Sequence, residues 1–152
     1  MANTYSQLYY HIVFAVRGRA NIISAKWRDQ LYKYISGITE RKNFKLFVIN
    51  GTRDHIHMLV GSKPDVNLSD YVRDIKANSS KYINENKYVY GHFEWQAGYG
   101  VFTVSPTQVK KVISYIENQE EHHNEKSFRR EYVELLELSG IDYDEKYLFD
   151  EV

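Results

Sequence analysis

Two histidines separated by one apolar residue constrain this 152-residue chain more than any other feature. They lie in the apolar stretch 54–60, which reads DHIHMLV. Side chains alternate between the faces of a β-strand, so His55 and His57 share one face while Ile56 and Met58 share the other. Such a strand places two potential imidazole ligands opposite a hydrophobic core. Taken alone, the same pattern also fits a partly buried strand whose histidines are only hydrogen-bonded.

The periodicity of the apolar residues predicts the element order β-α-β-β-α-β-β-α-α. Ser105, Pro106 and Gln108 have the spacing of a capping box with proline at the first helical position, and Gly140 is a typical helix C-cap. The order predicts an α+β fold, with an antiparallel β-sheet and helices packed on one side of it, of the ferredoxin-like or RRM-like type. The predicted strands are 5–16, 45–51, 54–61, 93–96 and 101–104, and the predicted helices are 24–40, 68–85, 106–123 and 128–139.

The length suits a single domain over residues 1–152, with an acidic C-terminal tail from about 140 to 152. No apolar run approaches the roughly 18 residues that a membrane span needs, and the first residues lack the pattern of a secretory signal. The chain has no cysteine, which excludes disulfides and thiolate metal sites. These features predict no membrane association and a cytoplasmic location.

Charge is divided unevenly although the net charge is zero. Residues 1–115 hold 16 Lys and Arg against 8 Asp and Glu, and residues 116–152 hold 4 against 12. This division predicts a basic surface that can meet a phosphate backbone. Candidate phosphate contacts are Arg17, Arg19, Arg53, Arg73, Lys76, Lys81, Lys110 and Lys111, and candidate base-stacking aromatics are Tyr71, Tyr88 and Trp95. For each of them, an ordinary solvated charge or a core aromatic is the simpler explanation.

The helix predicted from residue 106 carries a second set of polar groups. Its apolar stripe consists of Val109, Val112, Ile113 and Ile116. Tyr115 and Gln119 are four residues apart, so they stack on one flank of that stripe. A tyrosine can act as a covalent nucleophile, although Tyr115 at the rim of a core with its hydroxyl in water is the alternative. His122 and His123 receive no role and are surface or interface histidines by default.

A His-x-His strand followed by a helical Tyr-x-x-x-Gln resembles the HUH superfamily of single-strand nucleases. The chain is most similar to the IS200-like single-tyrosine transposases of bacterial insertion sequences. Further matching stretches are 10–14 (YHIVF), 98–105 (GYGVFTVS), 115–119 (YIENQ) and 140–148 (GIDYDEKYL). The resemblance implies an enzyme in which His55, His57 and Gln119 bind a divalent metal, Mg²⁺ or Mn²⁺, and Tyr115 is the nucleophile.

The resemblance also implies the partners of the protein. Members of this family cut and rejoin single-stranded DNA with hairpin ends through a 5′-phosphotyrosine intermediate. They form homodimers in which the tyrosine helix of one subunit completes the histidine site of the other in trans. Two alternatives remain open: a related nicking enzyme that acts on chromosomal repeat hairpins, and a non-catalytic module that binds single strands. Asp54, next to His55, either orients an imidazole or belongs to the turn before the strand.

Overall fold

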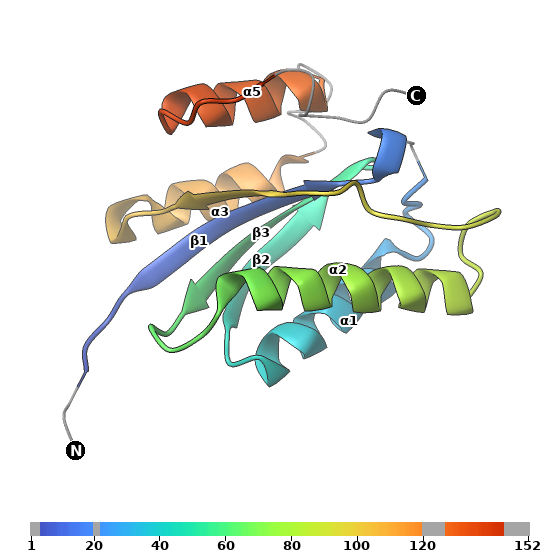
Figure 1. Cartoon of the computed structure of the whole chain (residues 1–152), viewed down its shortest axis with the longest axis horizontal. Helices are drawn as coiled ribbons and strands as arrows, with labels where there is room; N and C mark the ends of the chain where they lie inside the picture. The colour runs from blue at the N-terminus through green and yellow to red at the C-terminus, as the bar shows by residue number, and fades with distance from the viewer. Residues whose placement is uncertain (1–3, 20–21, 120–126, 145–152) are drawn as a thin grey trace.

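The computed structural model describes residues 4–19, 22–119 and 127–144 (Figure 1). Two short 3-10 turns cover Arg17–Arg19 and Pro106–Gln108. Among these residues, no helix has the length and apolar character needed to cross a membrane. The strands are β1 (Leu8–Ala15), β2 (Lys45–Gly51), β3 (His55–Ser62) and β4 (Gly100–Thr103), and the helices are α1 (Arg28–Arg41), α2 (Leu68–Glu85), α3 (Val109–Glu117) and α5 (Phe128–Leu138).

The strands form one antiparallel sheet in the order β2-β3-β1-β4. β2 and β3 pair as an antiparallel hairpin, with an irregularity between Leu46 and Val48. β3 pairs on both of its edges, and His57 lies opposite Val13 of β1. The predicted antiparallel α+β class is therefore confirmed, and the histidines lie on an inner strand that both neighbours hold rigidly.

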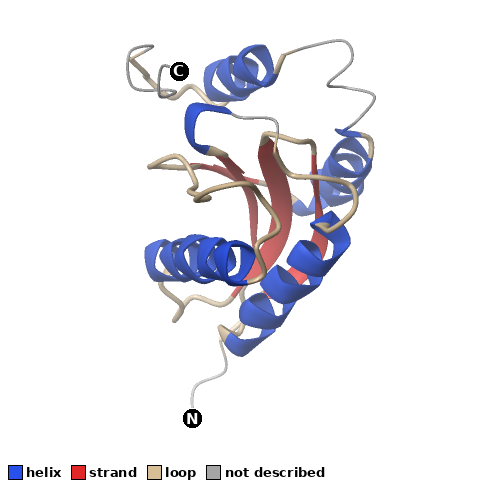
Figure 2. Ribbon diagram, turned by 90° about the vertical axis from the view of Figure 1, so that its right-hand side faces the viewer, coloured by secondary structure: helices blue, strands red, loops and turns tan. Residues whose placement is uncertain are grey.

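The helices cover both faces of this sheet, so the expectation that they lie on one side is wrong. Figure 1 and Figure 2 show α1 and α2 on one side and α3 and α5 on the other. The first layer buries the face that carries Ile56 and Met58, as the alternation predicted. The second layer covers the opposite face, where Val13 and Ala15 of β1 pack with Phe128 of α5. β1 is apolar on both faces, and such a strand needs cover on both.

The segment predicted as a strand at 93–96 makes only an isolated bridge, between Trp95 and Val16. The reason is that the Asn84 side chain makes the backbone hydrogen bonds that a neighbouring strand would otherwise make. Asn84 accepts a hydrogen bond from the Phe93 N–H at 2.7 Å and donates one to the Phe93 carbonyl at 3.0 Å. Phe93 thus has both backbone groups satisfied without a neighbouring strand.

Two helix starts also differ from the prediction. Ser24 accepts a hydrogen bond from the Lys26 N–H, so it caps a turn, and α1 begins only at Arg28. Ser105 makes no capping bond to the backbone, because its hydroxyl bonds Thr107 Oγ1, and a 3-10 turn precedes α3. α2 matches its predicted bounds.

The C-terminal end of α5 lies where it was predicted, whereas the C-terminal end of α3 does not. Gly140 follows α5 with φ 66°, as its predicted C-cap role requires. α3 ends at Glu117, because Asn118 leaves the helical conformation with ψ 27°. The helix predicted through residue 123 is thus interrupted, and His122 and His123 lie outside the described residues.

The candidate base-stacking aromatics belong to the core. Tyr71 is 1% exposed and Trp95 is 8% exposed, and Tyr88 stacks on Trp27 with ring centroids 5.0 Å apart. Lys76 of α2, a candidate phosphate contact, donates hydrogen bonds to two loop carbonyls, both at 2.7 Å. The simpler explanation is correct for the three aromatics, which pack in or against the core, whereas Lys76 is neither a phosphate contact in this structure nor an ordinary solvated charge.

Candidate active site

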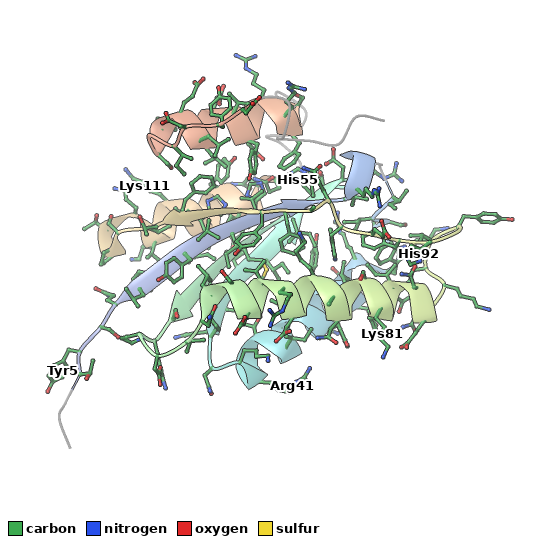
Figure 3. All side chains as sticks on the ribbon, viewed as in Figure 1. Tyr5, Arg41, His55, Lys81, His92 and Lys111 are labelled. Carbon is green, nitrogen blue, oxygen red and sulfur yellow. The ribbon has the colours of Figure 1, made fainter. Side chains whose placement is uncertain are left out.

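His55 and His57 share one face of β3, as predicted, and both side chains are fully buried. Figure 3 shows His55 between the sheet and the helices above it. Its Nδ1 lies 2.7 Å from Asp54 Oδ1 and 2.9 Å from Thr52 Oγ1. Asp54 therefore has both of its candidate roles, because it belongs to the turn before β3 and also orients an imidazole.

His57 is held by a third histidine. His11 of β1 is buried, and its Nε2 lies 2.7 Å from His57 Nδ1. Burial, reinforced by the charge of His57, lowers the pKa of His11 to about 3, so His11 is a neutral partner. Because the Nδ1 atoms of His55 and His57 are both engaged, the two Nε2 atoms face the same space. His11 has no predicted role, although it lies on the same face of β1 as Val13, which is opposite His57.

Gln119 and Tyr115 reach this space from α3 and the residues just after it. Gln119 Oε1 lies 3.0 Å from His55 Nε2, and Gln119 is 1% exposed. The Tyr115 ring is half-buried, with its centroid 5.8 Å from that of His57. Asn50 of β2 donates hydrogen bonds to the last carbonyls of α3 and so fixes the end of this helix on the sheet. The four residues predicted from the sequence therefore lie together within one chain.

A carboxylate that is not among the predicted site residues lies at the centre of this group. Glu131 of α5 is 6% exposed. Its Oε1 lies 2.8 Å from His57 Nε2 and 3.5 Å from His55 Nε2. Its Oε2 accepts a hydrogen bond from the Tyr115 hydroxyl. Phe128, one turn earlier on α5, stacks on the His55 ring with centroids 4.1 Å apart, which seats α5 over the histidines.

Mutual hydrogen bonding sets the charge states of these groups. Burial alone would lower the pKa of His55, but hydrogen bonds to Asp54 and Glu131 outweigh it and raise this pKa to about 9. Burial opposes ionisation of Glu131, but hydrogen bonds from His55 and His57 hold its pKa well below the usual range. Burial and the bond to the Glu131 carboxylate raise the pKa of Tyr115, which stays a neutral phenol.

The donor set fits a divalent metal ion. One ligand atom each from His55, His57 and Glu131 lies within 4.8 Å of the others, and the amide oxygen of Gln119 lies beside them. Two imidazole nitrogens with oxygen donors suit first-row ions such as Mn²⁺ better than Mg²⁺, which prefers oxygen ligands throughout. The described residues therefore bring together the three side chains that the resemblance predicts as ligands, and Glu131 lies among them as a further candidate.

A faint signal for Glu131 exists in the sequence. The apolar stripe of the last helix contains Phe128, Leu135 and Leu136, and Glu131 lies one turn after Phe128 at a position where an apolar residue is expected. An acidic residue on the buried stripe of a helix needs a partner. The sequence offers no means of identifying that partner as His57, which is 74 residues away.

Comparison with known proteins identifies the family. Residues 4–119 match the model of the family described as IS200-like transposases. The chain is 31% identical over 124 residues to the transposase for insertion sequence element IS200 from Salmonella typhimurium, which covers 78% of this chain and 81% of the relative. It is 25% identical over 118 residues to the ISDra2 transposase TnpA from Deinococcus radiodurans, which covers 74% of this chain and 84% of the relative.

Two solved structures share the fold. A candidate transposase from Deinococcus radiodurans superposes with a TM-score of 0.64 at 24% identity, over 78% of this chain and 95% of that chain. A REP-associated tyrosine transposase bound to a REP hairpin superposes with a TM-score of 0.62 at 14% identity, over 81% of this chain and 73% of that chain. The match to the family model includes Tyr115 and ends at Gln119, so α5 and Glu131 lie beyond it. The chain therefore belongs to the family of IS200-like transposases.

Proposed function

We propose that this transposase cuts and rejoins single-stranded DNA at hairpin-bearing ends through a 5′-phosphotyrosine on Tyr115. One observation carries the proposal: the Tyr115 phenol lies in the same buried group as two imidazoles whose Nε2 atoms face one space. A module that only binds single strands has no need of this combination. The excess of basic residues in 1–115 supports a polyanionic partner.

His55 Nε2, His57 Nε2 and Gln119 Oε1 are the proposed protein ligands of the metal, Mg²⁺ or Mn²⁺. The bound ion supplies Lewis acidity to the scissile phosphate. Asp54 and His11 keep the two imidazoles oriented from behind, which fixes their Nε2 atoms as the ligand atoms. His11, His55 and His57 lie on the two inner strands of the sheet, so the site is rigid before DNA binds.

Tyr115 Oη attacks phosphorus, and the bond between phosphorus and the 3′ oxygen breaks. The raised pKa of Tyr115 means that the phenol needs a proton acceptor. The Glu131 carboxylate accepts the hydrogen bond of this phenol and so positions its oxygen. Because the pKa of Glu131 is held low, this carboxylate is a weak base, and the proton of the phenol passes to water as the bond between oxygen and phosphorus forms. The leaving oxygen takes a proton from water and becomes a 3′-hydroxyl. A second 3′-hydroxyl reverses the sequence and reseals the strand, because the phosphotyrosine keeps the energy of the phosphodiester.

The homodimer with sites completed in trans is also part of the proposal. In the described chain, Tyr115 and Gln119 lie over the histidines of the same chain. The same residues form the same site if α3 of one subunit lies over β3 of another. The two arrangements differ only in which chain supplies the phenol, and subunit mixing separates them.

A covalent capture assay tests the proposed chemistry. The substrate is a single-stranded oligonucleotide that contains the imperfect hairpins found in the DNA flanking the gene, labelled at its 3′ end. With Mn²⁺, the protein should carry the label through denaturing electrophoresis, because the 5′ phosphate of the labelled fragment stays on the tyrosine. Tyr115→Phe should lose the adduct. The control is Tyr99→Phe, which removes the hydroxyl of an exposed tyrosine that donates a hydrogen bond to Ser69.

Each outcome of this assay has a clear meaning. An adduct that persists in Tyr115→Phe would remove this residue from the chemistry. Binding of the hairpin without any adduct in the unmodified protein would favour the non-catalytic module. An adduct with chromosomal repeat hairpins but none with element ends would favour the related nicking enzyme. One of the solved structures that share the fold of this chain is bound to a REP hairpin.

A further inference from the structure

Glu131 is a buried carboxylate whose two oxygens have different partners. Oε1 faces the Nε2 atoms of both strand histidines, at 2.8 Å and 3.5 Å. Oε2 faces the other way and accepts a hydrogen bond from the Tyr115 hydroxyl. One side chain from α5 therefore contacts the two imidazoles of β3 and the phenol of α3 at once.

A buried anion requires a cationic partner, and the described surroundings contain no Lys or Arg bonded to Glu131. Within the described ranges, the basic groups that pair with Glu131 are the two imidazoles. If these bind a metal, they cannot also be protonated, because a ligand imidazole uses its lone pair for the ion. Glu131 then needs the ion itself as its counter-charge.

The spacing of the atoms is compatible with this role. Ligand atoms about 2.0–2.4 Å from a shared ion lie at most about 4–5 Å from each other. The ligand atoms of His55, His57 and Glu131 lie within 4.8 Å of one another. Gln119 contributes a neutral oxygen beside them, so Glu131 is the one negatively charged donor in this group of four.

We infer that Glu131 is a fourth protein ligand of the metal through Oε1, and that its Oε2 positions the Tyr115 hydroxyl next to the bound ion. The inference rests on the proposed function for the identity of the nucleophile. It adds that α5, which lies beyond the segment matched by the family model, belongs to the metal site. The nucleophile and the ion are then held by the two oxygens of a single carboxylate.

Metal binding to the purified full-length chain tests this inference without any DNA. Isothermal titration with Mn²⁺ compares the unmodified protein with Glu131→Gln, which keeps the shape of the side chain and removes its charge. The matched control is Glu137→Gln, an exposed position on the same helix. Glu131→Gln should weaken Mn²⁺ binding at least roughly tenfold, as loss of a ligand does, and Glu137→Gln should bind like the unmodified protein. Equal affinity in Glu131→Gln and the control would overturn the inference.

A second measurement avoids substitution, in case Glu131→Gln folds poorly. The unmodified protein is labelled with ¹³C at the glutamate carboxyl groups, and Mn²⁺ is added below stoichiometry. Electron–nuclear double resonance of the bound Mn²⁺ should show the isotropic ¹³C coupling that arises only when a carboxylate oxygen is bonded directly to the ion, and unlabelled protein is the control. Absence of this coupling would overturn the inference.

Failure of the inference and failure of the proposed function give different results. If the phosphotyrosine adduct forms but Glu131→Gln binds Mn²⁺ with unchanged affinity, the proposed function stands and Glu131 is not a ligand. If Mn²⁺ binding depends on Glu131 but no adduct forms on Tyr115, the metal site stands and the nucleophile is wrong.

Discussion

Gln119 Oε1 lies 3.0 Å from His55 Nε2, although 64 residues separate them in the sequence. The contact joins the residues just after α3 to the central strand β3. It brings the third predicted ligand to the first within one chain, and Tyr115 comes with it because it lies one helical turn earlier. The geometry of the site is thus complete in a single chain, and the dimer proposal becomes a question of which chain supplies α3.

Subunit mixing addresses that question. Tyr115→Phe and the double variant His55→Ala/His57→Ala should each form no adduct alone. When they are mixed, a trans dimer regains one complete site, with the phenol from the histidine variant and the imidazoles from the tyrosine variant. The measurement is the return of the covalent adduct. Two different affinity tags show that subunits have exchanged, and an inactive mixture after proven exchange would refute assembly in trans.

Loss of either strand histidine should separate cleavage from binding. His55→Ala and His57→Ala remove a proposed metal ligand each, so adduct formation in Mg²⁺ or Mn²⁺ should disappear while hairpin affinity stays within about threefold, because phosphate contacts carry most of it. The comparison uses gel-shift binding and the adduct assay side by side. His92→Ala, at an exposed position, is the control and should keep both properties. Normal cleavage by either strand variant would remove that histidine from the site.

DNA binding should weaken steeply with salt. A surface that neutralises several phosphates gives a plot of log affinity against log salt with a slope steeper than about −2. Lys110 and Lys111 are exposed on α3, on the site's side of the sheet. Changing both to serine should make this slope shallower by roughly 1 to 2. Lys33 is exposed on α1, on the opposite side of the sheet, so Lys33→Ser should leave the slope unchanged. An affinity that does not change with salt concentration would count against a phosphate-binding surface.

Lys76 should stabilise the fold rather than bind DNA. Its ammonium donates to the Gln96 and Gly98 carbonyls, and burial lowers its pKa. Lys76→Met should lower the free energy of unfolding by about 1–3 kcal/mol, because two charge-assisted hydrogen bonds are lost. Urea denaturation gives this value. Lys81→Met on the same helix, where an exposed pair with Glu85 is lost, should change it by less than about 0.5 kcal/mol. Equal effects of the two variants would contradict the anchoring role.

Local patterns were sufficient to predict much of the site. The alternation around His55 and His57 predicted their shared face, because a strand has only two faces. The four-residue spacing of Tyr115 and Gln119 predicted their common flank, because a helix turns every 3.6 residues. Resemblance to a family then predicted that the two pairs meet across two subunits, whereas the structure describes them together within one chain.

The remaining features depend on contacts between distant elements. Glu131 reaches the histidines because Phe128 stacks on His55 and so seats α5. His11 meets His57 through the register of β1 against β3. The strand predicted at 93–96 failed because the Asn84 side chain took the backbone hydrogen bonds of Phe93. Propensity and periodicity carry no information about such partners.

The hydrogen bonds from Asn50 to the last two carbonyls of α3 have a consequence for how this chain can vary in length. They anchor α3 at its C-terminal end, next to Tyr115. The N-terminal end of α3 follows the connection 104–108, to which these bonds do not extend. An insertion in that connection lengthens a loop, whereas one residue inserted inside α3 after Tyr115 turns this side chain by about 100° relative to the end of the helix that leads to Gln119. Insertions and deletions among relatives should therefore collect before α3 and be absent between its tyrosine and the glutamine that follows.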